Sequence, residues 1–314
     1  MIIDTHVHVW SFPVLEEHGN KIQSTEDLLA FRTRYPELYE RTLTEDPIDN
    51  SDVLVAQMDE HGIDKTIVQA RPGEVSNDQV AQSVRRHPDR LYGLFRIGHD
   101  QEAAHDYIED PGPVREAAPA HIDYCVEELG MIGMGEMFVR AFTRELDPEL
   151  IAQDLKPIMD AVARHDIPIQ IPTAWTQFPG GLIYGDPIWT DEIACRYPDT
   201  PVVLTKMGRS LQTYFDHAIV VAMRNSNVLF DVVGTRPDHL RQAIDAIGSK
   251  RIMFGTDWSA TWRWINKPAD LYTMRLNVLE KAGLSDEECD DILWRNAVRV
   301  FKLDKVDAAR TAAA

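Results

Sequence analysis

Two histidines and one distant aspartate have the residue types and the spacing that metal chemistry requires. His6 and His8 end an apolar run at the start of the chain, and Asp257 ends another apolar run far along it. Side chains two residues apart on a strand point to the same face, so both imidazoles can aim at one point. Two imidazole nitrogens and one carboxylate suit a divalent ion such as Zn²⁺ and leave a position open for water.

Eight short apolar runs predict the strands that would carry these groups. Helix-like segments lie between most of the runs, over residues 51–61, 79–86, 147–165 and 211–225. Alternation of strands and helices over this length predicts an α/β fold, and eight units fit a single closed (β/α)8 TIM-type barrel. The predicted strands are residues 1–8, 65–70, 91–97, 131–138, 167–172, 201–206, 227–232 and 251–257.

In such a barrel the active site lies where the strands end, and the loops at that face shape the pocket. Candidate groups lie at or just past the ends of predicted strands: His6, His8, His99, Glu136, Lys206 and Asp257. Loop insertions are predicted at the same face after strands 1, 3 and 5, over residues 11–49, 101–119 and 177–187. We predict one domain over residues 1–314, with a frayed Ala-rich tail from residue 304.

The charge balance excludes some classes of function. The chain has 51 acidic residues and 32 Lys or Arg, so its formal net charge is −19, and a field of this sign repels nucleic-acid phosphates. No apolar stretch approaches the roughly 18 residues of a membrane helix, and no basic leader precedes Asp4. The three cysteines form no metal or disulfide spacing. We expect a cytoplasmic protein with a small-molecule substrate and no nucleic-acid or membrane partner; a homo-oligomer is compatible with the sequence.

The acidity has two interpretations, an ordinary well-hydrated surface or adaptation to a salt-rich cytoplasm. In the second case, added salt screens the self-repulsion of the acidic surface. We then expect the melting temperature to rise between low and molar KCl in a thermal unfolding series. A melting temperature that stays flat or falls across this series would end the salt-adapted interpretation.

Three motifs together resemble those of the amidohydrolase-related family, a branch of the amidohydrolase superfamily. That branch contains small metal-dependent hydrolases, lactonases and aromatic-acid decarboxylases. The resemblance runs from residue 1 to about residue 303 and implies a (β/α)8 barrel with one or two metal ions, in agreement with the strand count. The motifs are Ile3-Asp-Thr-His6-Val-His8, Phe254-Gly-Thr-Asp257 and Ile292-Leu-Trp-Arg-Asn296-Ala-Val-Arg-Val-Phe301.

Carried over residue by residue, the resemblance implies that His6 and His8 are metal ligands on strand 1. It also implies that Asp257 touches the metal and takes a proton from the attacking water. The chain departs from the family pattern at two positions. Pro172 stands where strand 5 ends in a histidine ligand, and Lys206 stands where strand 6 ends in another histidine. The cofactor implied is one divalent ion, Zn²⁺ or Mn²⁺, and a metal-free site is the alternative that these replacements leave open.

Two side chains could compensate for the missing histidines. Glu136 follows Gly133 and Gly135, and glycines just before a carboxylate on a barrel strand indicate close approach and an inward-pointing acid. It is either a metal ligand or a pocket carboxylate in an ion pair. Lys206 has three interpretations: a cation paired with a carboxylate, a group that stabilises an oxyanion or holds a substrate carboxylate, or a partial replacement for the metal.

Other residues are candidates for substrate contact. His99 follows strand 3 and faces either the pocket or solvent. Tryptophans gather after strands 5 and 8, among them Trp175 and Trp258, and predict an aromatic-lined pocket. Arg209 lies near them and could hold a substrate carboxylate with two parallel hydrogen bonds.

The leading functional hypothesis is a metal-dependent hydrolase that acts on an ester, lactone or amide bond of a small carboxylate-bearing substrate. A metal held by His6, His8 and Asp257 would lower the pKa of bound water toward about 7, and Lys206 would stabilise the oxyanion. The alternative is metal-dependent, non-oxidative decarboxylation of an aromatic or unsaturated acid. A third hypothesis is a barrel that binds a small ligand without catalysis.

Overall fold

The strands form two parallel four-stranded sheets, in the orders β10-β1-β4-β5 and β6-β7-β8-β9. The computed structural model describes residues 1–11, 48–69, 76–97, 110–173, 181–259 and 271–313. A short antiparallel pair lies apart from the two sheets, β2 (Trp10–Ser11) with β3 (Ile48–Asp49). The sheet strands are β1 (Ile3–His8), β4 (Lys65–Gln69), β5 (Leu91–Leu94), β6 (Ile169–Pro172), β7 (Val202–Thr205), β8 (Val228–Asp231), β9 (Ile252–Met253) and β10 (Trp258–Ser259).

Backbone contacts join the two sheets on both sides. On one side, Met134 forms parallel bridges with Phe95, which follows β5, and with Ile169 of β6. On the other side, the Thr5 N–H donates to the Phe254 carbonyl at 3.0 Å. The result is a ring of eight parallel strand positions that lie where the sequence predicts them, and the fold is the predicted (β/α)8 barrel.

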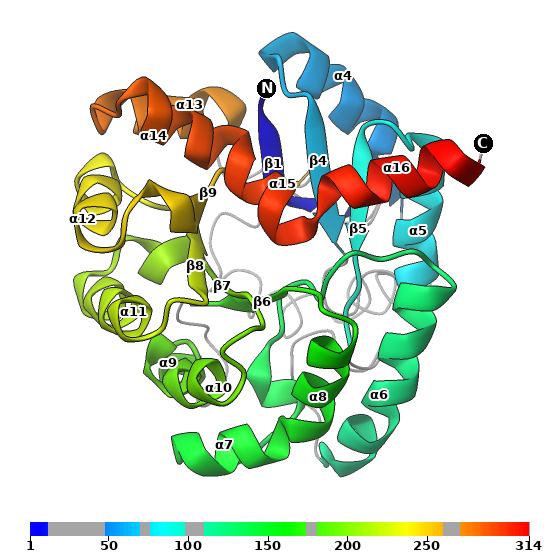
Figure 1. Cartoon of the computed structure of the whole chain (residues 1–314), viewed down its shortest axis with the longest axis vertical. Helices are drawn as coiled ribbons and strands as arrows, with labels where there is room; N and C mark the ends of the chain where they lie inside the picture. The colour runs from blue at the N-terminus through cyan, green and yellow to red at the C-terminus, as the bar shows by residue number, and fades with distance from the viewer. Residues whose placement is uncertain (12–47, 70–75, 98–109, 174–180, 260–270, 314) are drawn as a thin grey trace, which may run out of the picture.

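Helices surround the strands (Figure 1). Helix α4 matches its predicted span, because Gly62 takes a left-handed φ of 68° and its N–H caps the Met58 carbonyl. Within the described ranges, no helix has both the length and the apolar character that crossing a membrane requires. The helices are α4 (Ser51–His61), α5 (Asn77–Arg86), α6 (Gly112–Glu127), α7 (Pro148–Asp154), α8 (Lys156–Arg164), α9 (Gly181–Tyr184), α10 (Thr190–Arg196), α11 (Gln212–Arg224), α12 (Pro237–Ile247), α13 (Leu271–Lys281), α14 (Asp286–Asp290), α15 (Asn296–Phe301) and α16 (Leu303–Ala313).

Two predicted loop insertions contain helix. The sequence predicts a loop over residues 101–119, but α6 begins at Gly112 and contains Pro119. A buried apolar face at helical spacing compensates for the missing N–H of that proline. The face consists of Val114, Ala118, Ile122 and Cys125. The predicted loop over residues 177–187 includes α9 and the start of a 3-10 turn at Pro187–Trp189, and residues 12–47 lie outside the described part of the chain.

The C-terminal tail is helical, so the prediction of a frayed end from residue 304 is wrong. Asp307 of α16 accepts hydrogen bonds from Lys65 Nζ at 2.5 Å and from the Tyr92 hydroxyl at 2.6 Å. The Arg310 guanidinium lies 4.6 Å from the centroid of the Tyr92 ring. These contacts hold α16 against β4 and β5, as Figure 1 shows.

The barrel interior has an apolar floor with polar side chains above it. Alternate strand residues point inward, and those near the strand starts pack with α15. The floor consists of Ile3, Ile67, Tyr92, Leu94, Val203, Leu229, Met253, Val300 and Phe301. Farther along the strands the inward positions are polar and buried, at His6, Gln69, Gln170, Thr205 and Asp231. The floor therefore supports a polar layer at the carboxyl ends of the strands.

Candidate metal centre

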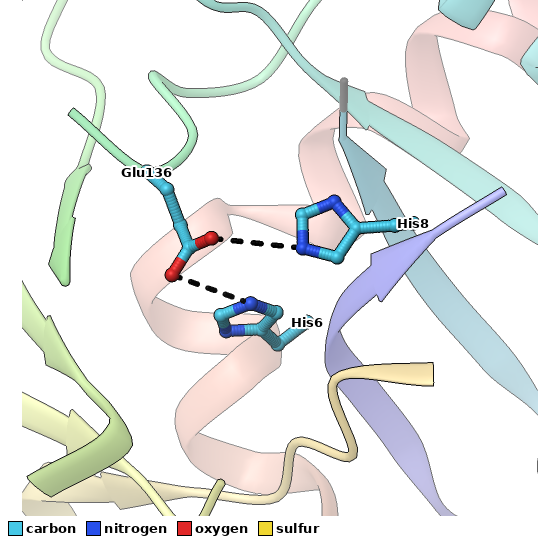
Figure 2. Close-up of side chains that lie close together, drawn as sticks. All are labelled: His6, His8 and Glu136. Atoms are coloured by element: carbon cyan, nitrogen blue, oxygen red, sulfur yellow. Dashed lines mark ion pairs between the residues drawn. The ribbon is translucent and has the colours of Figure 1, made fainter. Parts of the chain in front are cut away.

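An irregularity in β1 turns both histidines into the barrel. Ile3 packs in the interior floor, and strict alternation would place His6 on the opposite face. The pairing of β1 with β4 shifts register between Asp4 and Val7, which reverses the alternation. Figure 2 shows the two imidazoles directed at the carboxylate of Glu136.

Four side chains converge at this point with the spacing of metal ligands. His6 Nε2 lies 3.6 Å from Glu136 Oε1 and 3.5 Å from Asp257 Oδ1. His8 Nε2 lies 3.6 Å from Glu136 Oε2 and 3.3 Å from Asp257 Oδ1. These separations are longer than good hydrogen bonds. They match the edge of about 3.4 Å between ligands that surround a zinc ion tetrahedrally at about 2.1 Å.

Residues behind the ligands fix their orientation. Asp231 Oδ2 lies 2.8 Å from His6 Nδ1, the contact by which a carboxylate orients a metal-binding imidazole. The Thr205 hydroxyl donates to Glu136 Oε1 at 3.1 Å, and the Glu136 N–H donates to Gln69 Oε1 at 2.9 Å. The sequence analysis missed all three supporting residues. Asp231 carried a signal, because it is a carboxylate at the end of a predicted strand.

The close approach expected at the glycines before Glu136 is present. A Cβ atom at Gly135 would lie 2.2 Å from Gln69 Oε1, and one at Gly133 would lie 3.0 Å from the Pro168 carbonyl oxygen. Side chains at these positions would push the segment away from its neighbouring strands. The glycines therefore bring Glu136 to the ligand cluster.

Asp257 reaches the cluster from a turn that is fastened to β1. Its φ of 61° is left-handed, which is uncommon for a residue with a side chain. The Asp257 N–H donates to the His6 carbonyl at 2.9 Å. Thr256 donates to the Asp4 carboxylate from its N–H at 3.1 Å and from its hydroxyl at 2.5 Å. Burial raises the pKa of Asp4 to about 7, although the bonds from Thr256 oppose this.

Lys206 places its ammonium in the same cluster. Nζ donates a short hydrogen bond to Glu136 Oε1 and lies 3.5 Å from His6 Nε2 and 3.7 Å from Asp257 Oδ2. The residue is 7% exposed, which makes it a buried cation among carboxylates. The sequence analysis considered Lys206 as a cation paired with a carboxylate, and the structure shows ion pairs with both Glu136 and Asp257.

The backbone that carries Lys206 is unusual. Five consecutive residues, 206–210, have positive φ between 40° and 74°. The Lys206 N–H donates to Asp231 Oδ1 at 2.7 Å, and the Gly208 N–H donates to the Thr173 hydroxyl at 2.9 Å. A left-handed conformation strains residues that carry side chains. The two hydrogen bonds offset this strain and hold the segment in place.

Replacing Gly208 with alanine should destabilise the protein strongly. A Cβ atom there would lie 2.4 Å from the backbone nitrogen of Phe215, at a left-handed φ of 74°. We expect Gly208→Ala to lower the free energy of unfolding by about 2–4 kcal/mol, measured by urea denaturation. Gly62→Ala is the control, since a Cβ at Gly62 meets nothing within 4 Å at a similar φ of 68°. Equal losses in the two variants would contradict the steric argument.

Opposite charges keep the cluster ionised despite its burial. Burial and the Lys206 ammonium lower the pKa of His6, but the carboxylates of Glu136 and Asp231 outweigh them and raise it to about 10. Burial alone would raise the pKa of Glu136 and of Asp257, yet Lys206 and the histidines hold both well below their usual range. Burial lowers the pKa of Lys206, and Asp257 and Glu136 more than restore it. A divalent ion that binds here would take the place of the proton on His6, because only a neutral imidazole coordinates a metal.

The residues present fit a divalent ion at this point. Mixed imidazole and carboxylate donors suit Zn²⁺ or Mn²⁺, and His6, His8 and Glu136 hold ligand atoms within 4.8 Å of one another. Pro172, at the end of β6, has no donor atom on its side chain, so this strand, which is the predicted strand 5, adds no side-chain donor there. The candidate ligands come from β1, from the segment that carries Glu136, and from the turn between β9 and β10.

The expected substrate contacts have different outcomes. His99 and Trp175 lie outside the described residues. Trp258 is 4% exposed, and its indole N–H donates to Gln57 of α4 at 2.8 Å. The Trp258 side chain is therefore buried against α4, and its contact with substrate stays a prediction. Arg209 follows Lys206 in the left-handed segment, close enough for its charge to lower the pKa of that lysine.

Comparison with known proteins finds a family model and relatives that match most of the chain. A sequence model of the amidohydrolase family matches residues 3–303. The gamma-resorcylate decarboxylase of Polaromonas sp. is 26% identical over 350 residues, which cover 93% of this chain and 98% of that protein.

Two solved structures share the fold. The 5-carboxyvanillate decarboxylase from Sphingomonas paucimobilis superposes with a TM-score of 0.64 at 17% identity, covering 96% of this chain and 98% of that chain. The 5-carboxyvanillate decarboxylase from Novosphingobium aromaticivorans, solved with bound manganese, gives a TM-score of 0.62 at 18% identity over 96% and 97% of the two chains.

Proposed function

Because the chain belongs to the amidohydrolase family, we propose that it catalyses the metal-dependent, non-oxidative decarboxylation of an aromatic acid. The observation that carries this proposal is the similarity to a gamma-resorcylate decarboxylase along 93% of the chain. It favours the alternative of the sequence analysis over hydrolysis, its leading hypothesis. Two groups in the cluster support it, the Lys206 ammonium and the Asp257 carboxylate, because a carboxylate substrate needs a cation beside it and its ring carbon needs a group that can deliver a proton.

The reaction exchanges one group for another on a ring carbon. A proton adds to the carbon that carries the carboxylate, the bond to the carboxylate carbon breaks, and its electron pair stays with the ring as CO₂ leaves. A divalent ion held by His6, His8, Glu136 and Asp257 would supply positive charge beside the acid. That charge offsets the negative charge of the cluster, which would otherwise repel the substrate.

The chain's own residues bind the acid and move the proton. The Lys206 ammonium lies in the cluster and would pair with the substrate carboxylate, and the Arg209 guanidinium would add a second positive charge near it. Asp257 is the carboxylate that faces both His8 and Lys206. Lys206 keeps it ionised before substrate binds. Once the acid has paired with Lys206, that hold weakens, so Asp257 can take up a proton from solvent and pass it to the ring carbon.

The test is a substrate panel on protein loaded with Zn²⁺ or Mn²⁺. The panel contains 2,6-dihydroxybenzoate, other hydroxybenzoates and a set of lactones. We expect release of CO₂ and formation of the matching phenol from at least one hydroxybenzoate, measured by headspace analysis and chromatography. Chelator-treated protein is the control and should be inactive.

The other outcomes separate the competing hypotheses. Ring opening of a lactone without CO₂ release would overturn decarboxylation and restore hydrolysis. Absence of turnover with either metal, together with a raised melting temperature in the presence of an acid, would identify a barrel that binds without catalysis.

A further inference from the structure

The ligand cluster contains a cation of its own, the Lys206 ammonium. It donates a hydrogen bond to Glu136 Oε1, an oxygen that would otherwise be available to a metal ion. Glu136 Oε1 faces His6 Nε2 at 3.6 Å. The same oxygen accepts a hydrogen bond from the Thr205 hydroxyl at 3.1 Å and another from the Lys206 ammonium. A carboxylate oxygen has two lone-pair sites, so these two donors use both of them. Glu136 Oε2, which faces His8, is the oxygen that they leave free.

The ammonium also shares the other ligands. Nζ lies 3.5 Å from His6 Nε2 and 3.7 Å from Asp257 Oδ2. A divalent ion held by His6, Asp257 and Glu136 would lie close to the Lys206 ammonium. The ion and the ammonium would repel each other strongly, because the site is buried and screening by water is weak there. The ion and the ammonium therefore cannot both be satisfied by Glu136 Oε1.

The Lys206 ammonium can move toward the more exposed side of the site. The side chains of Lys206 and Asp257 are 9% and 10% exposed, whereas those of His6, His8 and Glu136 are 0%, 3% and 5% exposed. The mouth of the site therefore lies on the side of Lys206 and Asp257. The Lys206 backbone is held by Asp231, so the ammonium can leave Glu136 by side-chain rotation while its Cα stays in place.

We propose that Lys206 competes with the divalent metal for Glu136, and that metal binding releases its ammonium to receive the carboxylate of the substrate. The inference rests on the proposed function, because it assumes a metal and an acid at this site. In this proposal the Lys206 ammonium pairs with Glu136 in the metal-free protein and with the substrate carboxylate in the metal-loaded protein, so Lys206 selects for substrates that are acids. Acid binding then follows metal binding, because the ammonium is committed to Glu136 until the metal takes its place.

The experiment compares Lys206→Met with the parent and with Lys156→Met at one fixed pH. Lys156 is the matched control, because its ammonium pairs with Asp160 on the exposed face of α8. Chelator-treated protein is titrated with Mn²⁺ by calorimetry. The Mn²⁺-loaded and metal-free forms are then titrated with 2,6-dihydroxybenzoate. A thermal melt checks that each variant is folded, and Lys206→Gln replaces Lys206→Met if the latter does not fold.

We expect Lys206→Met to bind Mn²⁺ at least about 10-fold more tightly than the parent, within the usual range of coupling between two ligands. Its Mn²⁺-loaded form should bind the acid at least about 10-fold more weakly. The parent should bind the acid only when Mn²⁺ is present, and Lys156→Met should match the parent throughout.

Two results would overturn the inference and leave the proposed function standing. Equal or weaker Mn²⁺ affinity in Lys206→Met would show that the ammonium is no competitor. Unchanged affinity of that variant for the acid would show that the ammonium does not receive it. If neither parent nor variant binds Mn²⁺ or, in the same titration, Zn²⁺, both proposals fall. If the predicted affinities appear but the substrate panel yields no CO₂, the inference stands and decarboxylation falls.

Discussion

His8→Ala should lose the bound metal and all measurable turnover while it keeps the fold. His8 Nε2 faces both Glu136 and Asp257. Its other ring nitrogen has no hydrogen-bond partner within the described ranges, so the imidazole has no second structural duty there. Loss of a supporting residue behind a metal ligand weakens binding 10- to 100-fold, and we expect loss of a ligand to exceed about 100-fold.

The measurement is elemental analysis of the purified variant together with its turnover in the substrate assay. His87→Ala is the matched control, because that histidine pairs with Asp52 at the surface, away from the ligand cluster. The control should retain parental metal content and activity. Parental metal content in His8→Ala would remove His8 from the ligand set.

Asp257→Asn should keep the fold but lose most of the activity. The amide retains an oxygen on the site and the shape of the side chain, but it cannot exchange a proton with substrate. General acid–base catalysis contributes about 10²–10⁴-fold in rate, and we expect kcat to fall within that range. Metal binding should weaken, because one negative charge is lost from the cluster.

Turnover is measured at saturating Mn²⁺, so that weaker metal binding does not hide the effect on chemistry. Asp238→Asn serves as the control, since that carboxylate pairs with Arg236 at the surface. If Asp257→Asn turns over within about threefold of the parent under these conditions, the proton transfer belongs to another group.

The periodicity of apolar residues predicted those strands and helices that short stretches of sequence determine. The apolar run that ends at His8 became β1, and α4 took its predicted span. The segment over residues 147–165 was predicted as one helix, but it forms α7 and α8, because Pro157 has no N–H with which to continue the first helix. A helical period is insensitive to this kind of interruption, since the apolar faces on either side remain in phase.

The support of the ligand cluster depends on contacts between strands, which periodicity does not contain. The contact from Asp231 to His6 spans 225 positions, and that from Thr205 to Glu136 spans 69. The register shift in β1 is likewise set by pairing with β4. Motif and strand position were enough to place His6, His8, Glu136 and Asp257 near one another, whereas the atoms that hold them follow from the closed barrel.

The bonds between Asp4 and Thr256 join positions separated by 252 residues, which affects how the protein is made. As the chain is synthesised, β1 appears first and can pair with β4 early, but its other edge must wait for the strand that brings Thr256. A nascent chain that ends before residue 257 cannot place Asp257 beside His6 and His8. A nascent chain therefore presents an incomplete set of donors to the metal ions of the cell. The complete centre can form only after Asp257 has been synthesised, when the strands from β1 to β9 have already had time to fold.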